Sequence, residues 1–186
     1  MKSINKKSSL SLGPGLLSFC KIHFALAGIF IAQIILYDAS MLIEPEAVLD
    51  RWFVVSMLLL VSGFIWYFVK SKSGNVISYK ALLLVMMMTD MALASFTVYS
   101  TRGMASKAVL LFILPIIISG LLKSKSALYA AAIVSIAVYT LTSIAYFVWN
   151  FNEGYKVELY GEVGFYSAMF LVVAALLSTV LHPKNN

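Results

Sequence analysis

The sequence has few charged side chains, one cysteine and none of the short motifs that mark common enzyme active sites. Only 12% of its 186 residues are charged, whereas 61% are hydrophobic, and the mean hydropathy is +0.92. A water-soluble globule of this size needs more polar surface than that. The composition therefore excludes an ordinary soluble domain and indicates a chain that lies in a bilayer.

The single cysteine, Cys20, excludes an intramolecular disulfide and a CxxC redox or zinc site. We expect no bound metal. The sequence also lacks the phosphate loop GxxxxGK[ST], the dinucleotide motif GxGxxG, the zinc-protease motif HExxH and the hydrolase motif GxSxG. It has no polar stretch long enough for a separate catalytic domain. We therefore expect neither enzymatic activity nor a cofactor.

The net charge of +6 would raise the question of nucleic acid in a soluble protein. Here the basic residues stand between apolar runs, where they serve as orientation signals. We therefore expect no nucleic-acid partner, and the partner that the composition indicates is the lipid bilayer.

Six apolar runs approach or exceed the length needed to cross the ~30 Å hydrocarbon core as helices. They cover residues 16–37, 52–69, 81–100, 104–122, 127–149 and 164–181. The sequence thus predicts an all-α polytopic membrane protein, a bundle of six transmembrane helices over residues 16–182, between short tails at 1–15 and 183–186. We expect the run Gly13-Pro14-Gly15 to stop any helix upstream of the first span.

Lysine and arginine predict the orientation of these spans. With both tails in the cytoplasm, most of the 14 basic residues fall in cytoplasmic segments. All acidic residues except Asp90 then lie in two longer outer loops, around residues 38–50 and 153–162. The expected location is the bacterial cytoplasmic (inner) membrane, with the N-terminus and the C-terminus both inside.

Small residues predict where helices approach one another closely. Three pairs are spaced by one helical turn: Gly28 with Ala32, Ala131 with Ser135, and Ala174 with Ser178. Such pairs allow close backbone contact in a membrane. The short basic turn at 123–126 predicts that the fourth and fifth spans form an antiparallel pair.

Asp90 is the most informative single residue. An ionisable group inside a span costs roughly 2.5 to 3.5 kcal/mol to insert, so we expect Asp90 to face the bundle interior, to be protonated or to have a partner. His23 in the first span lies at a similar depth, counting ~1.5 Å per residue from the inner ends of the two spans. We expect these residues to contact each other directly or through Thr89 or Gln33. A neutral Asp90 that only packs against a neighbouring helix is an equal alternative.

Pro115 lies inside the fourth span, where it lacks a backbone donor and clashes with the carbonyl of Leu111. We expect a kink or a loosened stretch near the centre of that span. A simple packing kink is the favoured interpretation, and a functional hinge is the alternative.

Four features occur together between residues 51 and 143: Arg51-Trp52 opening the second span, Asp90, the segment VYSTRGMASKAVLLF at 98–112, and the segment IIISGLLKSKSALYAAAIVS at 116–135. Together they resemble the membrane-embedded sensor region of two-component histidine kinases of the type IV pilus sensor (PilS-like) kind. The family usually has glycine where this chain has Arg102, and it often has proline where this chain has Lys107.

The resemblance implies a six-helix region that senses a membrane or envelope signal, such as a membrane-embedded protein ligand, and shifts its last helix to change kinase activity. It implies a homodimer, with a kinase and a response regulator as partners. It also implies that Asp90 and the turn containing Tyr99, Arg102 and Gly103 couple the signal to the output. The family continues after the sixth span into kinase domains, so we expect here a sensor module without its kinase or a stand-alone protein with the same membrane fold.

Two other functions fit the same pattern of spans. The size, the basic charge and the six spans are also those of the substrate-binding membrane component of an energy-coupling-factor importer for vitamin-like molecules. The small residues in FALAGIFIA at 24–32 resemble those that such proteins use against their partner. The third alternative is a structural or assembly membrane protein without a ligand.

Overall fold

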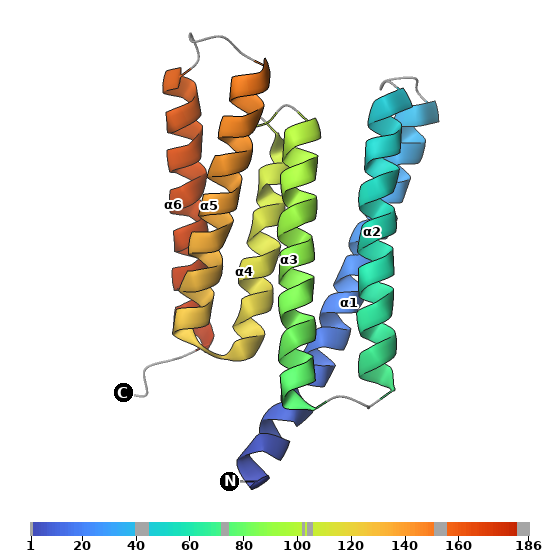
Figure 1. The fold of residues 1–186 in the computed structure, drawn as a ribbon, viewed down its shortest axis with the longest axis vertical. Coiled ribbons are helices and arrows are strands. Elements are labelled where there is room, and N and C mark those ends of the chain that lie inside the picture. Colours follow the sequence, from blue (N-terminus) through green and yellow to red (C-terminus); the bar gives the residue numbers. More distant parts are fainter. Residues whose placement is uncertain are drawn as a thin grey trace. The chain divides into compact units, whose positions relative to one another are not determined.

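The computed structural model of this chain consists of helices joined by short connections (Figure 1). It describes residues 2–39, 45–71, 75–101, 103, 106–150 and 156–181. The helices, including the 3₁₀ segments η2 and η3, are α1 (Lys2–Ala39), α2 (Pro45–Lys70), α3 (Val76–Ser100), η2 (Lys107–Phe112), α4 (Ile113–Ser119), η3 (Gly120–Leu122), α5 (Lys125–Asn150) and α6 (Lys156–Leu181). No strand occurs in the described residues, and the predicted all-α fold is confirmed.

Five of these helices are long and apolar enough to cross a membrane. The apolar stretches are Leu12–Tyr37, Ala47–Lys70, Val76–Ser100, Lys125–Asn150 and Val157–Leu181, each of 24 to 26 residues. They expose large apolar side chains such as Leu36, Phe64 and Val148. Water-soluble proteins rarely leave so many large apolar groups uncovered, whereas lipid tails cover them readily. The chain is therefore a multi-pass membrane protein.

The fourth expected span is not a continuous α-helix. The 3₁₀ helix η2 precedes α4 and the 3₁₀ turn η3 follows it, and the resulting apolar stretch, Lys107–Leu122, is shorter than the other five. We call this stretch the broken helix. Pro115 lies near the start of α4. Its missing N–H and its clash with the Leu111 carbonyl disfavour regular α-helix at that point, which explains the loosened geometry that the sequence predicts.

The predicted helix break at Gly13-Pro14-Gly15 is wrong. α1 runs without interruption from Lys2 to Ala39 and contains Pro14. Once a helix has formed, each further residue adds a hydrogen bond, so the one bond lost at a proline bends the helix without ending it. The Ser18 hydroxyl donates to the Pro14 carbonyl at 3.0 Å, one turn further on. The apolar part of α1 accordingly begins at Leu12.

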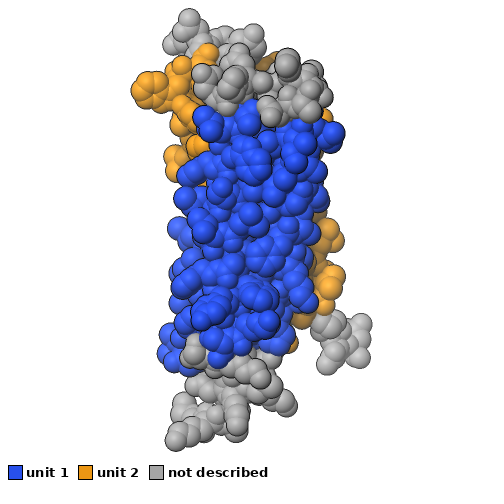
Figure 2. Space-filling model, turned by 90° about the vertical axis from the view of Figure 1, so that its right-hand side faces the viewer, with its two compact units in different colours: residues 1–89 blue, residues 90–186 orange. Residues whose placement is uncertain are grey.

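The chain divides into two compact units, unit 1 (residues 1–89) and unit 2 (residues 90–186), coloured separately in Figure 2. The boundary falls inside α3, between Thr89 and Asp90. Unit 1 is built on α1 and α2, which run antiparallel and pack against each other. Their buried side chains recur at steps of three, four or seven residues, at 16, 20, 23, 27 and 34 on α1 and at 55, 58, 62, 65 and 69 on α2. This spacing places each set on one face of its helix.

Unit 2 is built around a hydrophobic core that contains three aromatic rings. α5 and α6 run antiparallel, and the broken helix packs against both of them. The core consists of nine buried side chains, Ala94, Val98, Val109, Phe112, Ile116, Ala132, Tyr139, Phe170 and Ala174. Only Lys123 and Ser124 separate η3 from α5, so α4 and α5 form the antiparallel pair that the sequence predicts. Lys123 ends η3 in the left-handed conformation, with φ 50°.

Candidate functional site

The acidic residue of α3 is buried, as expected for an ionisable group inside a span. Asp90 is only 4% exposed, and Thr89 beside it is half-buried. Because Asp90 and His23 belong to different units, the contact expected for this pair stays a prediction.

His23 is buried between α1 and α2 and bonds to a residue that the sequence analysis did not identify. Its Nδ1 lies 3.1 Å from the Ser62 hydroxyl, and both side chains are buried. Both residues lie about 10 Å from the predicted inner ends of their spans, at 1.5 Å per residue, and this equal depth is the signal that could have paired them. Gln33 is exposed on α1, so it does not share the buried surroundings of His23.

The turn that follows α3 is held together by hydrogen bonds among its own residues. The Thr101 and Ser106 hydroxyls are 2.6 Å apart. The Ser106 hydroxyl accepts from the Ala108 N–H at 3.1 Å and thereby caps η2. The Ser106 N–H donates to the Gly103 carbonyl at 3.0 Å. The side chains and the backbone together fix how α3 ends and how the broken helix begins.

Gly103 and Tyr99 connect this turn to α5. Gly103 is buried with φ +59°, and a Cβ at this position would overlap the Tyr146 ring. The Tyr99 and Tyr146 rings meet edge to face, with centroids 5.8 Å apart. The structure therefore brings two of the three predicted coupling residues of the turn together on Tyr146. The third, Arg102, lies outside the described residues.

Three hydroxyl side chains form a buried polar face on α5 that the sequence analysis did not identify. Ser135, Tyr139 and Ser143 are buried, and their hydroxyl oxygens have no hydrogen-bond partner among the described residues. The Ser143 and Tyr139 hydroxyls are hydrogen-bonding neighbours, but their geometry in this structure does not complete the bond. The sequence signal is the spacing of four, which places all three residues on one face of the helix. We call these three residues the hydroxyl seam.

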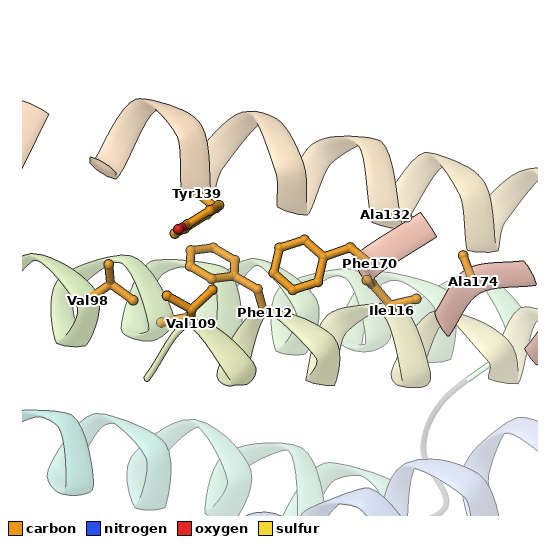
Figure 3. Close-up of a cluster of buried hydrophobic side chains, with 9 residues drawn as sticks. Val98, Val109, Phe112, Ile116, Ala132, Tyr139, Phe170 and Ala174 are labelled. Carbon is orange, nitrogen blue, oxygen red and sulfur yellow. The ribbon is translucent and has the colours of Figure 1, made fainter. Parts of the chain in front are cut away.

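Aromatic rings from two neighbouring elements surround Tyr139. Its ring lies 5.8 Å from Phe112 in η2 and 6.1 Å from Phe170 in α6, centroid to centroid (Figure 3). A third ring, Tyr166 of α6, lies 5.7 Å away at 77°. Tilted and edge-to-face contacts of this kind are favourable beyond the area that they bury. Pro115, buried in α4, follows Phe112 in the broken helix.

Candidate metal ligands do not gather anywhere in the part of the chain that the structure describes. There is no group of three or more His, Cys, Asp or Glu side chains with the proximity to hold an ion.

Comparison with known proteins does not place the chain in a family. No protein-family model, no curated protein and no solved structure matches it.

Proposed function

We propose that this chain is a membrane-embedded signal-input module of a two-component system, with six transmembrane helices and both termini in the cytoplasm. It lies in the bacterial cytoplasmic membrane as a homodimer and has no catalytic activity of its own. Its output acts on a histidine kinase and a response regulator. Its input is a membrane or envelope signal, such as a membrane-embedded protein ligand.

The length of the broken helix supports a sixth crossing. It contains six residues in η2, seven in α4 and three in η3. As a regular α-helix it would be only about 24 Å long at 1.5 Å per residue. The 3₁₀ segments rise about 2.0 Å per residue and lengthen it to about 28 Å, which approaches the ~30 Å hydrocarbon core. Lys107 at its start and Lys123 after its end are exposed and can extend to the headgroups.

Contacts between basic and aromatic side chains support the assigned ends of the first two spans. The Lys70 amine lies 4.4 Å from the centre of the Trp66 ring at the end of α2. The Arg51 guanidinium lies 5.0 Å from the centre of the Tyr37 ring, near the opposite end of the same helix pair. Aromatic and basic residues concentrate at the headgroup level of membranes. The excess of lysine near residues 70–80 and 123–125 supports a cytoplasmic position for those ends.

The observation that carries the proposed signalling role is a continuous packed path from the turn after α3 to the last helix. Gly103 and Tyr99 contact Tyr146 on α5. Two turns away on α5, Tyr139 contacts Phe170 on α6. A ligand that displaces the turn therefore displaces α5 and α6 as well, provided that it binds the two arrangements with different affinities.

Asp90 makes this packed path sensitive to charge. It is buried on α3, the helix that leads into the turn. A carboxyl group in an apolar span favours the helix position in which it is protonated or paired. The position of α3 therefore depends on the state of Asp90.

The test is the phosphorylation of response regulators in the cells that make this protein. Removal of the chain should change the phosphorylation of one regulator, and the wild-type chain should restore it. Asp90→Asn should restore it incompletely while reaching normal abundance in the membrane. The matched control is Met88→Leu, at an exposed position of α3, which should restore it fully. Unchanged phosphorylation of every regulator after removal would contradict the proposal.

The hydroxyl seam favours one alternative, the substrate-binding component of a small-molecule importer. Small-molecule sites combine aromatic walls with a few polar groups, as unit 2 does around Tyr139. Gentle purification from the native membrane, followed by mass spectrometry of bound molecules, separates the two functions. A vitamin-like molecule at one copy per chain, with no effect of the chain on regulator phosphorylation, would favour the importer.

A further inference from the structure

We propose that the hydroxyl seam is a water-accessible binding site for a small uncharged molecule with a hydrogen-bonding group, and that the structure shows this site closed. Water itself is the smallest such molecule. If this site also receives the signal, that role rests on the proposed function. The presence of the site can be tested without any measurement of signalling.

The seam hydroxyls differ from other hydroxyls in the helices of this chain. Thr97, Ser119 and Thr142 each donate to a backbone carbonyl three or four residues earlier. Ser135 and Ser143 do not make this bond, and the Tyr139 hydroxyl lies too far from its own backbone to make one. A buried hydroxyl without a partner is unfavourable in an apolar interior. An arrangement that admits a hydrogen-bonding molecule to the seam removes this cost.

The side chains around the seam determine the chemistry of the ligand. Hydroxyls both donate and accept, so they accommodate carbonyl, hydroxyl and amide groups. Phe112, Tyr166 and Phe170 supply apolar walls. Glu162, one turn before Tyr166 on α6, acts on Tyr139 electrostatically but is itself exposed. A charged ligand would lose its hydration without gaining an opposite charge in the seam, so the site suits an uncharged one.

The broken helix forms the wall that can move. η2 has 3₁₀ geometry, whose hydrogen bonds are weaker than those of an α-helix. Pro115 supplies no N–H for the Leu111 carbonyl. Phe112 is the last residue of η2, three residues before Pro115, and its ring packs on Tyr139 (Figure 3). A displacement of this short stretch uncovers Tyr139 while α5 and α6 stay folded.

Cysteine labelling of the full chain in its native membrane tests this inference. In a Cys20→Ser background, which removes the only native thiol, single cysteines are introduced as Ser143→Cys and Ser135→Cys. The matched controls are Leu141→Cys and Ile133→Cys, two residues before each seam position on the exposed face of α5. Leu141 is 68% exposed, at nearly the same depth as Ser143. The probe is a water-soluble maleimide, which reacts with the thiolate and therefore needs water at the thiol.

The seam cysteines should react at least ~10-fold faster than their lipid-facing controls, because a thiol ionises in water and not in lipid. Tyr139→Phe should slow the labelling of Ser143→Cys several-fold, because it removes a hydroxyl that holds water in the seam. Seam cysteines that react as slowly as the controls would overturn the inference. Should one seam variant fail to accumulate in the membrane, the other makes the same test. Slow labelling of the seam cysteines would not contradict the proposed signalling role, because labelling involves neither the kinase nor the response regulator.

Discussion

The two units of this chain differ in the surroundings of their buried polar side chains. In unit 1, His23 on α1 bonds to Ser62 on α2, and the buried residues of both helices recur at helical spacings. In unit 2, the core contains three aromatic rings among aliphatic side chains, and the three hydroxyls of the seam complete no hydrogen bond among the described residues. A hydrogen bond between two helices favours the packing arrangement that makes it, whereas buried hydroxyls without a bond favour a second arrangement that supplies one. We infer that unit 2 changes its packing.

The largest effect should come from removing the central ring of unit 2. Phe112→Ala leaves a cavity beside Tyr139 and Phe170 and should lower the free energy of unfolding by about 3 to 5 kcal/mol. Thermal unfolding in detergent micelles measures this loss. The control is Leu110→Ala, at an exposed position of η2, which should cost less than about 1 kcal/mol. Equal losses for the two variants would show that Phe112 does not organise the core.

A smaller loss is expected at the turn after α3. Gly103→Ala places a side chain at positive φ and into the Tyr146 ring, so it should cost about 2 to 4 kcal/mol. Gly161→Ala, in α6 with open space around its Cβ position, should be neutral or stabilising by up to about 1 kcal/mol. The same unfolding measurement compares the two. A Gly103→Ala protein as stable as Gly161→Ala would mean that the turn does not pack on α5 as described.

Removal of a seam hydroxyl should have the opposite sign. Tyr139→Phe keeps the ring and deletes an oxygen without a described partner, so it should stabilise the closed arrangement, and with it the folded protein, by about 1 kcal/mol. Tyr129→Phe, at an exposed position near the start of α5, should leave the melting temperature unchanged. A loss of stability in Tyr139→Phe would indicate that the hydroxyl has a partner and would remove the difference between the units.

The smallest effect should appear in unit 1. Ser62→Ala deletes the hydroxyl that bonds to His23 and should cost about 0.6 kcal/mol, the typical value for a hydrogen bond between membrane helices. Ser56→Ala, exposed on the same helix, should cost nothing measurable. Indistinguishable melting temperatures for the two variants would show that the His23 bond contributes nothing to the packing of unit 1.

The features that the sequence predicts well depend on strong local physics. Apolar runs of sufficient length form helices in a membrane, because no other open structure satisfies the backbone there. Asp90 is buried and Pro115 coincides with the broken helix, because a charge and a missing donor have large energetic costs. The break at Gly13-Pro14-Gly15 is wrong because the cost of one proline is smaller than the gain from the helix on both sides of it.

The features that the sequence misses depend on which face of a helix meets its neighbour. Of the small-residue pairs, Ala131 with Ser135 and Ala174 with Ser178 are buried, but Gly28 and Ala32 are exposed. A helix that is apolar all round carries little information about its buried face. For the same reason the partner of His23 and the orientation of the hydroxyl seam became evident only from the packed helices.

The most direct test of the six-span architecture is the side of the membrane on which α5 begins. Single cysteines at two exposed positions, Ser126→Cys at the start of α5 and Asn150→Cys at its end, are labelled in a Cys20→Ser background with a membrane-impermeant maleimide. In intact spheroplasts Asn150→Cys should react, and Ser126→Cys should react only after lysis. Labelling of Ser126→Cys in intact spheroplasts would mean that the broken helix does not cross the membrane, and it would contradict the account.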